Sequence, residues 1–81
     1  MLIDALNLLY AEKTQTGYKA EIELETADNL EFSGSIEIDS DWNYDLGFLA
    51  TFVNTDEDKI FVHSVLSSED FKNDVRNFIP S

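Results

Sequence analysis

The sequence predicts an α+β fold: a four-stranded antiparallel meander flanked by an N-terminal and a C-terminal helix, in the order α-β-β-β-β-α. Three observations lead to this prediction. Two neighbouring segments alternate between apolar and polar residues, apolar residues near both ends recur at helical spacing, and only short polar links separate the strand-like segments. The 81 residues suffice for a single small acidic domain, residues 1–81, with one modest core.

A helix is predicted for residues 2–13, LIDALNLLYAEK. Leu2, Leu6 and Leu9 recur at helical spacing and would form a broad apolar stripe. Gly17 follows the segment, and glycine commonly ends a helix. We therefore expect this helix to pack on the apolar face of the sheet.

The clearest prediction is a hairpin of two strands, residues 18–26 and 30–39, joined by Ala-Asp-Asn. From residue 18 to 25 and from 30 to 39, even positions are apolar or glycine and odd positions are charged or small and polar. Such alternation turns one face of a strand toward the core and the other toward water. Gly34 interrupts the apolar face, which marks either a bulge or a close approach by a neighbouring element.

Two more strands are predicted from apolar runs. Residues 46–54, LGFLATFVN, are apolar at both odd and even positions, which suits a central strand covered by helices. Residues 59–65, KIFVHSV, follow an acidic turn and would form the edge of the sheet. We expect Phe61 and Val65 to be exposed on that edge.

The last predicted element is a helix that reaches Phe78. Either Ser67 or Ser68 can cap its first turn, which also carries two acidic residues, as the helix dipole favours. Phe71 and Val75 begin its core-facing stripe.

Charge is the most informative property of the composition. Seventeen acidic residues oppose five basic ones, which gives a net charge of −12. A field of this strength repels nucleic acid and anionic membranes and attracts basic surfaces. We therefore expect no direct nucleic-acid binding and no membrane binding, and a partner that is basic.

The predicted hairpin gathers many of the acidic residues on its wet face. Carboxylates two residues apart on a strand lie about 6.5–7 Å apart, and facing residues of a hairpin lie about 5 Å apart. Two rows of negative charge on a rigid sheet can occupy a Lys/Arg groove that otherwise holds nucleic acid. The residues predicted to bind the partner through charge are Glu21, Glu23, Glu25, Glu31, Glu37, Asp39, Asp41 and Asp45.

Two large aromatic residues, Trp42 and Tyr44, lie in the loop beside these rows. Trp and Tyr are enriched at binding hot spots, so we expect one of them to anchor the partner. In the alternative interpretation, both rings fold back and cap the core. The acidic rows likewise have an alternative interpretation, as a solvated face that prevents association between sheets.

Other chemistries find little support in the sequence. DSDWNYD partly matches a calcium loop, but Tyr44 and Ala50 stand where that loop needs Gly and Glu. His63 is the only histidine and there is no cysteine, so a metal site would lack partners. No nucleophile elbow or glycine-rich phosphate loop is present. We expect a protein that is not an enzyme and that uses no cofactor and no metal.

In size, charge and hairpin architecture the chain is similar to acidic inhibitors that phages and toxin–antitoxin systems use against nucleases, among them nucleic-acid mimics and anti-CRISPR proteins. The likeness is one of composition, since no motif carries it. It implies a non-enzymatic inhibitor whose carboxylate face docks on the basic groove of a nucleic-acid-binding protein or nuclease complex.

The alternative function is a structural or accessory protein-protein interaction module. In that case the interface, for example of a homodimer, would be the apolar strand edge at 59–65 rather than the charged face. Under either hypothesis we expect a cytoplasmic location. The N-terminal apolar run is short and carries Asp4, and the chain lacks cysteine.

Overall fold

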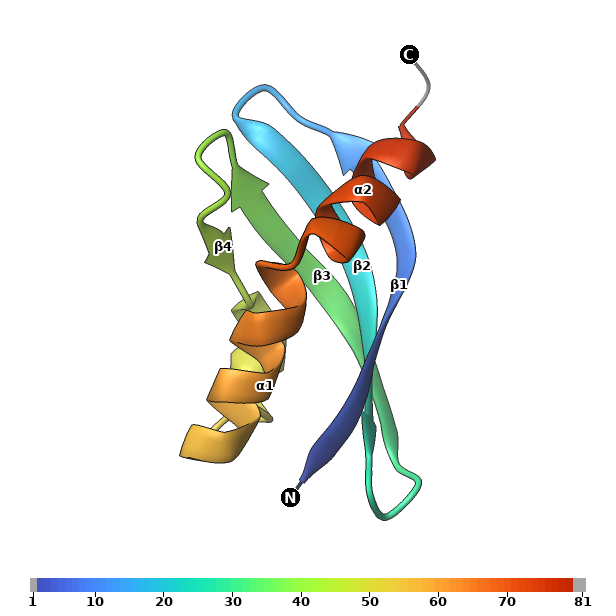
Figure 1. The fold of residues 1–81 in the computed structure, drawn as a ribbon, viewed down its shortest axis with the longest axis vertical. Helices are drawn as coiled ribbons and strands as arrows, with labels where there is room; N and C mark the ends of the chain where they lie inside the picture. The colour runs from blue at the N-terminus through green and yellow to red at the C-terminus, as the bar shows by residue number, and fades with distance from the viewer. Residues whose placement is uncertain (1, 80–81) are drawn as a thin grey trace.

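The computed structural model describes residues 2–79 and has the predicted α+β class (Figure 1). Four antiparallel strands form one sheet in the order β1-β2-β3-β4, and the helices follow the sheet in the chain. The elements are β1 (Ile3–Lys13), β2 (Gly17–Thr26), β3 (Glu31–Asp39), β4 (Tyr44–Asp45), the 3-10 helix η1 (Gly47–Thr51), α1 (Asp56–Leu66) and α2 (Glu69–Phe78).

The predicted N-terminal helix at 2–13 is wrong, because this segment is the strand β1. The pairing of β1 with β2 shifts register twice, between Ile3 and Ala5 and again between Leu8 and Tyr10. Each shift adds one residue to β1, so residues on the core side lie three apart across it rather than two. The two irregularities interrupt the strand alternation of β1, whereas Leu2 and Leu9, on which the helical stripe was based, are exposed.

The predicted hairpin is confirmed as β2 and β3. Their register is unbroken from the pair of Gly17 and Asp39 to the pair of Glu25 and Glu31. Gly34 lies within this regular pairing, so it marks no bulge. Instead, a Cβ atom at Gly34 would lie 3.0 Å from Cγ of Leu49, which shows that η1 packs directly on this point of the sheet.

The predicted strand at 46–54 is wrong as well. Strand pairing beyond β3 is limited to the two residues of β4, and the chain then turns into η1. The side chain of Leu49 is fully buried over Gly34, so this apolar run crosses the face of the sheet instead of joining its edge. Only Leu49 and Val53 of the run are buried and Phe48 is 65% exposed, so its apolar residues did not mark a strand covered on both sides.

The predicted strand at 59–65 is wrong too, since these residues belong to α1. Phe61 and Val65 are half-buried against the core rather than exposed on a sheet edge. The start of α1 is well specified: Thr55 is the N-cap, and its side-chain oxygen accepts a hydrogen bond from the Asp58 N–H at 3.2 Å. The aromatic and β-branched residues of the segment favour a strand, but the cap and the packing prevail.

The predicted C-terminal helix is confirmed as α2. Ser68 is its N-cap and accepts a hydrogen bond from the Phe71 N–H at 3.2 Å, while Phe71 and Val75 are buried. Both helices lie over one face of the sheet (Figure 1), which leaves the other face of β2 and β3 to solvent. Within residues 2–79, no helix is long and apolar enough to cross a membrane.

Candidate functional site

The candidate site is the face of β2 and β3 that points away from the helices, called here the carboxylate face. It carries Glu21, Glu23 and Glu25 from β2 and Glu31 and Glu37 from β3. Among the residues that alternate with them, Ile22, Leu24 and Ile36 are fully buried on the helix side. Because side chains alternate between the two faces of a strand, the glutamates lie together on the solvent side.

The register shows how these side chains face one another across the hairpin. Glu25 is paired with Glu31, so two carboxylates lie directly opposite each other. Glu21 and Glu23 face serines, and Glu37 faces Lys19. The negative charge is therefore densest at the end of the hairpin nearest its turn, and Lys19 offsets it at the other end.

The cost of this arrangement is visible at Glu25. Partial burial raises the pKa of this carboxyl above its ordinary value of 4.5, and the neighbouring charges of Glu23, Glu31 and Asp4 raise it further. A like charge nearby disfavours the ionised form of an acid. The like charges on the carboxylate face therefore lower the stability of the folded protein.

Asp39 has a structural role at the end of β3. Its Oδ1 accepts hydrogen bonds from the backbone N–H groups of Asp41 at 2.9 Å and Asn43 at 2.8 Å. Its Oδ2 accepts a further bond from the Asn43 side chain at 3.2 Å. These bonds, mainly those from Asn43, hold the pKa of Asp39 below its ordinary value of 3.8. The carboxylate of Asp39 is therefore occupied in shaping the loop before β4.

The remaining predicted acids, Asp41 and Asp45, are exposed in or beside this loop. Asp45 pairs with Glu37 in the β3–β4 ladder, so it extends the carboxylate face by one strand. Its Oδ1 also accepts a hydrogen bond from the Gly47 N–H at 2.8 Å, which leaves the second oxygen for a partner.

Trp42 lies on the helix side of the molecule and not beside the carboxylate face. Its Nε1–H donates a hydrogen bond to the backbone oxygen of Leu66, at the end of α1, at 2.8 Å. The indole ring packs on Tyr18 with 5.6 Å between ring centroids. The cationic groups of Lys72 and Arg76 on α2 lie 5.7 and 6.0 Å from the ring centroid. The structure therefore shows the Trp42 ring capping the core, as in the alternative interpretation.

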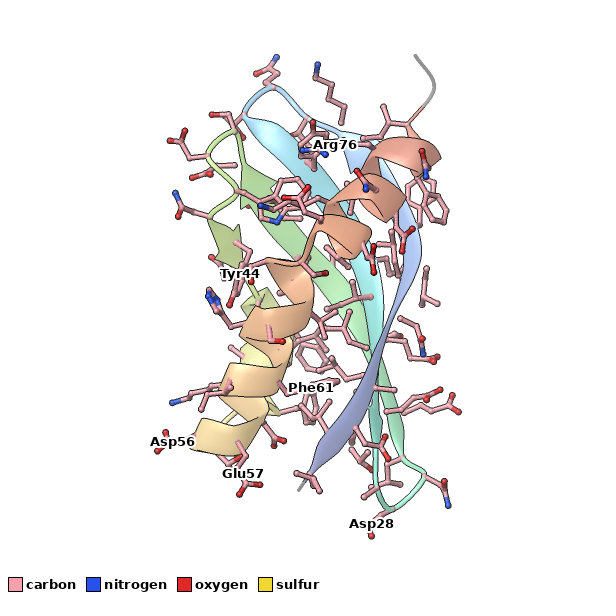
Figure 2. All side chains as sticks on the ribbon, viewed as in Figure 1. Asp28, Tyr44, Asp56, Glu57, Phe61 and Arg76 are labelled. Atoms are coloured by element: carbon pink, nitrogen blue, oxygen red, sulfur yellow. The ribbon has the colours of Figure 1, made fainter. Side chains whose placement is uncertain are left out.

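Tyr44 also points to the helix side. It pairs with Ile38, which is buried, and its hydroxyl forms a 2.8 Å hydrogen bond with Nδ1 of His63 on α1. Partial burial raises the pKa of Tyr44 above its ordinary value of 10.0. Figure 2 shows Tyr44 beside α1, where it helps to attach the short strand β4 to the helix layer.

The contribution of β1 to the carboxylate face was not predicted from the sequence. Asp4 lies close enough to Glu25 to affect its pKa, and Asn7 pairs with Glu23. Neither could be placed on the face while residues 2–13 were predicted to be helical. The strand-like signal was present in Leu6 and Leu8, which alternate with Asn7 between the two register shifts.

A second acidic residue that the sequence reasoning overlooked is Asp58, which is fully buried. Its Oδ1 accepts a 2.8 Å hydrogen bond from the Ile3 N–H, and this bond ties the start of β1 to the start of α1. Its Oδ2 has no hydrogen-bond partner within residues 2–79. The spacing Thr55-Asp-Glu-Asp58 resembles a capping box and is the sequence signal for this position.

The described residues contain no group of three or more His, Cys, Asp or Glu side chains arranged to hold a metal ion. The carboxylate face presents negative charge and hydrogen-bond acceptors on the solvent side of the sheet. Comparisons with protein-family models, with curated proteins and with solved structures found no match to this chain.

Proposed function

We propose that this protein is a non-enzymatic acidic inhibitor that docks its carboxylate face on the basic groove of a nucleic-acid-binding protein and so excludes the nucleic acid. One observation carries the proposal: five glutamates of β2 and β3 share a solvent-facing sheet surface in which Glu25 and Glu31 are directly opposed. Opposed like charges destabilise a sheet, so a partner that neutralises them relieves a cost already present in the free protein.

The proposed mechanism is competition by charge. Lysine and arginine side chains that normally contact phosphates would instead pair with the glutamates, and these charge-assisted hydrogen bonds are stronger than neutral ones. The strong overall field would also speed encounter with a basic partner. The residues that supply the contacts are Glu21, Glu23, Glu25, Glu31 and Glu37, with Asp45 at the border.

The two aromatic residues are not part of this proposal as anchors. Trp42 and Tyr44 are both committed to contacts with the helices. Specificity would instead come from the shape of the twisted sheet and from the uneven charge along it, with Lys19 at one end and Glu25 and Glu31 at the other.

The experiment is affinity capture from nuclease-treated lysate of cells that produce the protein. It compares the wild type with Glu23→Gln/Glu31→Gln and with a control, Asp56→Asn/Glu57→Gln. Both double variants remove the same charge. The control residues are exposed in the first turn of α1, and Figure 2 shows them at a distance from the β2–β3 hairpin, whose turn carries Asp28.

The wild type and the control should retain a DNA- or RNA-handling protein, while the face variant should bind the purified partner about tenfold more weakly. Equal losses in both variants would mean that only net charge matters. Retention by the face variant would show that these glutamates do not form the interface.

The alternative function, an accessory interaction module with an apolar edge, loses the edge on which it was based, since residues 59–65 form part of α1. A different edge, that of β1, is the surface for which the structure supports a separate inference.

A further inference from the structure

The outer edge of β1 is a second surface with hydrogen-bonding capacity, because no neighbouring strand within residues 2–79 covers it. β1 is the first strand in the sheet order. Such an edge presents backbone N–H and C=O groups that can bind another strand. At the start of β1 the Ile3 N–H is already bonded to Asp58, so the available stretch begins beyond it.

A groove runs beside this edge on the helix side of the sheet. Its volume is about 760 Å³, and its apolar walls are Leu6 and Leu8 of β1, Val65 of α1, and Phe71 and Phe78 of α2. This volume lies in the range of pockets that bind small ligands or side chains. The groove and the strand edge are adjacent because Leu6 and Leu8 belong to both.

Large apolar side chains are exposed along the same border. Tyr10 is 52% exposed and Phe78 is 45% exposed. Tyr10 and Phe78 meet edge to face with 6.3 Å between their ring centroids, so one end of the border has an ordered aromatic wall. Exposed apolar groups that are contiguous with a groove mark interaction sites.

The charge of α2 is sorted between its two sides. Asp70 and Asp74 lie on the groove, while Lys72 and Arg76 face the ring of Trp42. The single salt bridge found among residues 2–79 joins Lys72 to Glu69, so neither groove aspartate is paired with a cation there. The rim of the apolar groove is therefore negative.

We propose that the β1 edge and this groove bind an extended segment of a partner protein, as an added strand whose alternate side chains are apolar and whose flanking residues include Lys or Arg. Alternate side chains of an added strand would enter the groove over Leu6 and Leu8, and the basic residues would reach Asp70 and Asp74. The backbone hydrogen bonds supply affinity, and the groove supplies side-chain specificity.

The charge argues against a second copy of this chain as the occupant. Two copies would each bring a net charge of −12 to the contact, and like charges across an interface disfavour association. A basic, apolar segment is complementary in both respects. This inference does not depend on the proposed function, because the groove and the carboxylate face lie on opposite sides of the sheet.

The test uses synthetic peptides of about eight residues, a common strand length. Alternate positions are Val, Leu or Phe, the positions between them are Thr, and Lys or Arg flank this segment at both ends; a matched set replaces Lys and Arg with Glu. Fluorescence anisotropy would show binding of basic peptides only, and amide shifts of the labelled protein would fall on β1 residues 5–10 and on α2. Absence of binding at about 1 mM peptide would overturn the proposal.

Two further measurements separate strand addition from general attraction. Asp70→Asn/Asp74→Asn should weaken binding about tenfold, whereas Asp28→Asn/Asp41→Asn, which removes equal charge from two turns, should not. A peptide N-methylated at the amides that point toward β1 should not bind, whereas a peptide N-methylated at the alternate amides, which point away from β1, should still bind. Equal binding of the two N-methylated peptides, or a concentration-dependent dimer of the protein without peptide, would contradict the proposal. Glu23→Gln/Glu31→Gln should leave these contacts in place, so the two proposals fail separately.

Discussion

At the scale of single residues, Glu25 and Asp39 show how position decides what a carboxylate does. Both are acids in or at the end of the same hairpin, yet the pKa of Glu25 is raised and that of Asp39 is lowered. Partial burial and opposed like charges disfavour ionised Glu25, whereas backbone N–H groups stabilise ionised Asp39. Glu25 is thus available to a cationic partner in a way that Asp39, already bonded within its loop, is not.

The raised pKa of Glu25 predicts how the stability of the domain depends on pH. An acid whose folded-state pKa exceeds its unfolded value makes the folded state bind more protons, so its contribution falls as pH rises from 4.5 through the folded-state pKa. Glu25→Gln should therefore be more stable than the wild type at about pH 7 and equal to it at about pH 4.

Urea unfolding of both proteins at the two pH values measures this difference. Glu21→Gln is the matched control, since Glu21 faces Ser35 rather than another acid. A stabilisation of Glu25→Gln that persists unchanged in acid would show that charge repulsion at Glu25 is not its cause.

At the scale of elements, the local pattern was sufficient where a strand keeps its register. The alternation of Tyr18 to Glu25 predicted both β2 and the face on which its glutamates lie, because no bulge interrupts the pairing with β3. β1 was predicted to be helical from the spacing of Leu2, Leu6 and Leu9, but Leu2 and Leu9 are exposed, and two register shifts interrupt the alternation that would have identified a strand. The carboxylate face was therefore predicted from β2 and β3, but the contribution of Asp4 was not.

The elements after β3 depend on tertiary contacts that a local pattern does not contain. Leu49 leaves the sheet because Gly34 provides space for it, and α1 forms against the sheet despite its strand-like composition. Trp42 and Tyr44 both bond to α1, a segment that was predicted to be a strand, so their positions relative to the carboxylate face could not be predicted.

The contact between Gly34 and Leu49 predicts energetic coupling between β3 and η1. Gly34→Val should destabilise the fold by about 1–3 kcal/mol through overpacking, and Leu49→Ala by about 2–5 kcal/mol through the cavity it leaves. The double variant should lose less than the sum of both, with a coupling of about 0.5–3 kcal/mol, because the added valine can enter the space left by Leu49.

Chemical unfolding of the wild type, the two single variants and the double variant gives the coupling free energy. Val75→Ala, a buried truncation on α2, is the control and should combine additively with Gly34→Val. Additivity in both cycles would contradict the packing of η1 over Gly34.

At the scale of the whole molecule, negative charge lies on both sides of the sheet, since Asp70 and Asp74 of α2 line the groove on the helix side. The carboxylate face carries five glutamates and Lys19 from β2 and β3, whereas Lys72 and Arg76 lie near Trp42 on the helix side. Self-repulsion at a net charge of −12 destabilises a compact domain of 81 residues. The proposed function accounts for this cost through the basic partner that the face would engage. Composition alone predicted that the partner is positively charged, but its identity depends on shape as well as on charge.

The proposed inhibitor competes with nucleic acid, and displacement of a labelled short DNA or RNA duplex from the purified captured partner measures this competition. The proposal predicts complete displacement by the wild type, weaker displacement as salt is raised, and an activity about tenfold lower for Glu23→Lys/Glu37→Lys. A ternary complex in which the partner holds nucleic acid and this protein together, at wild-type affinity for each, would contradict it.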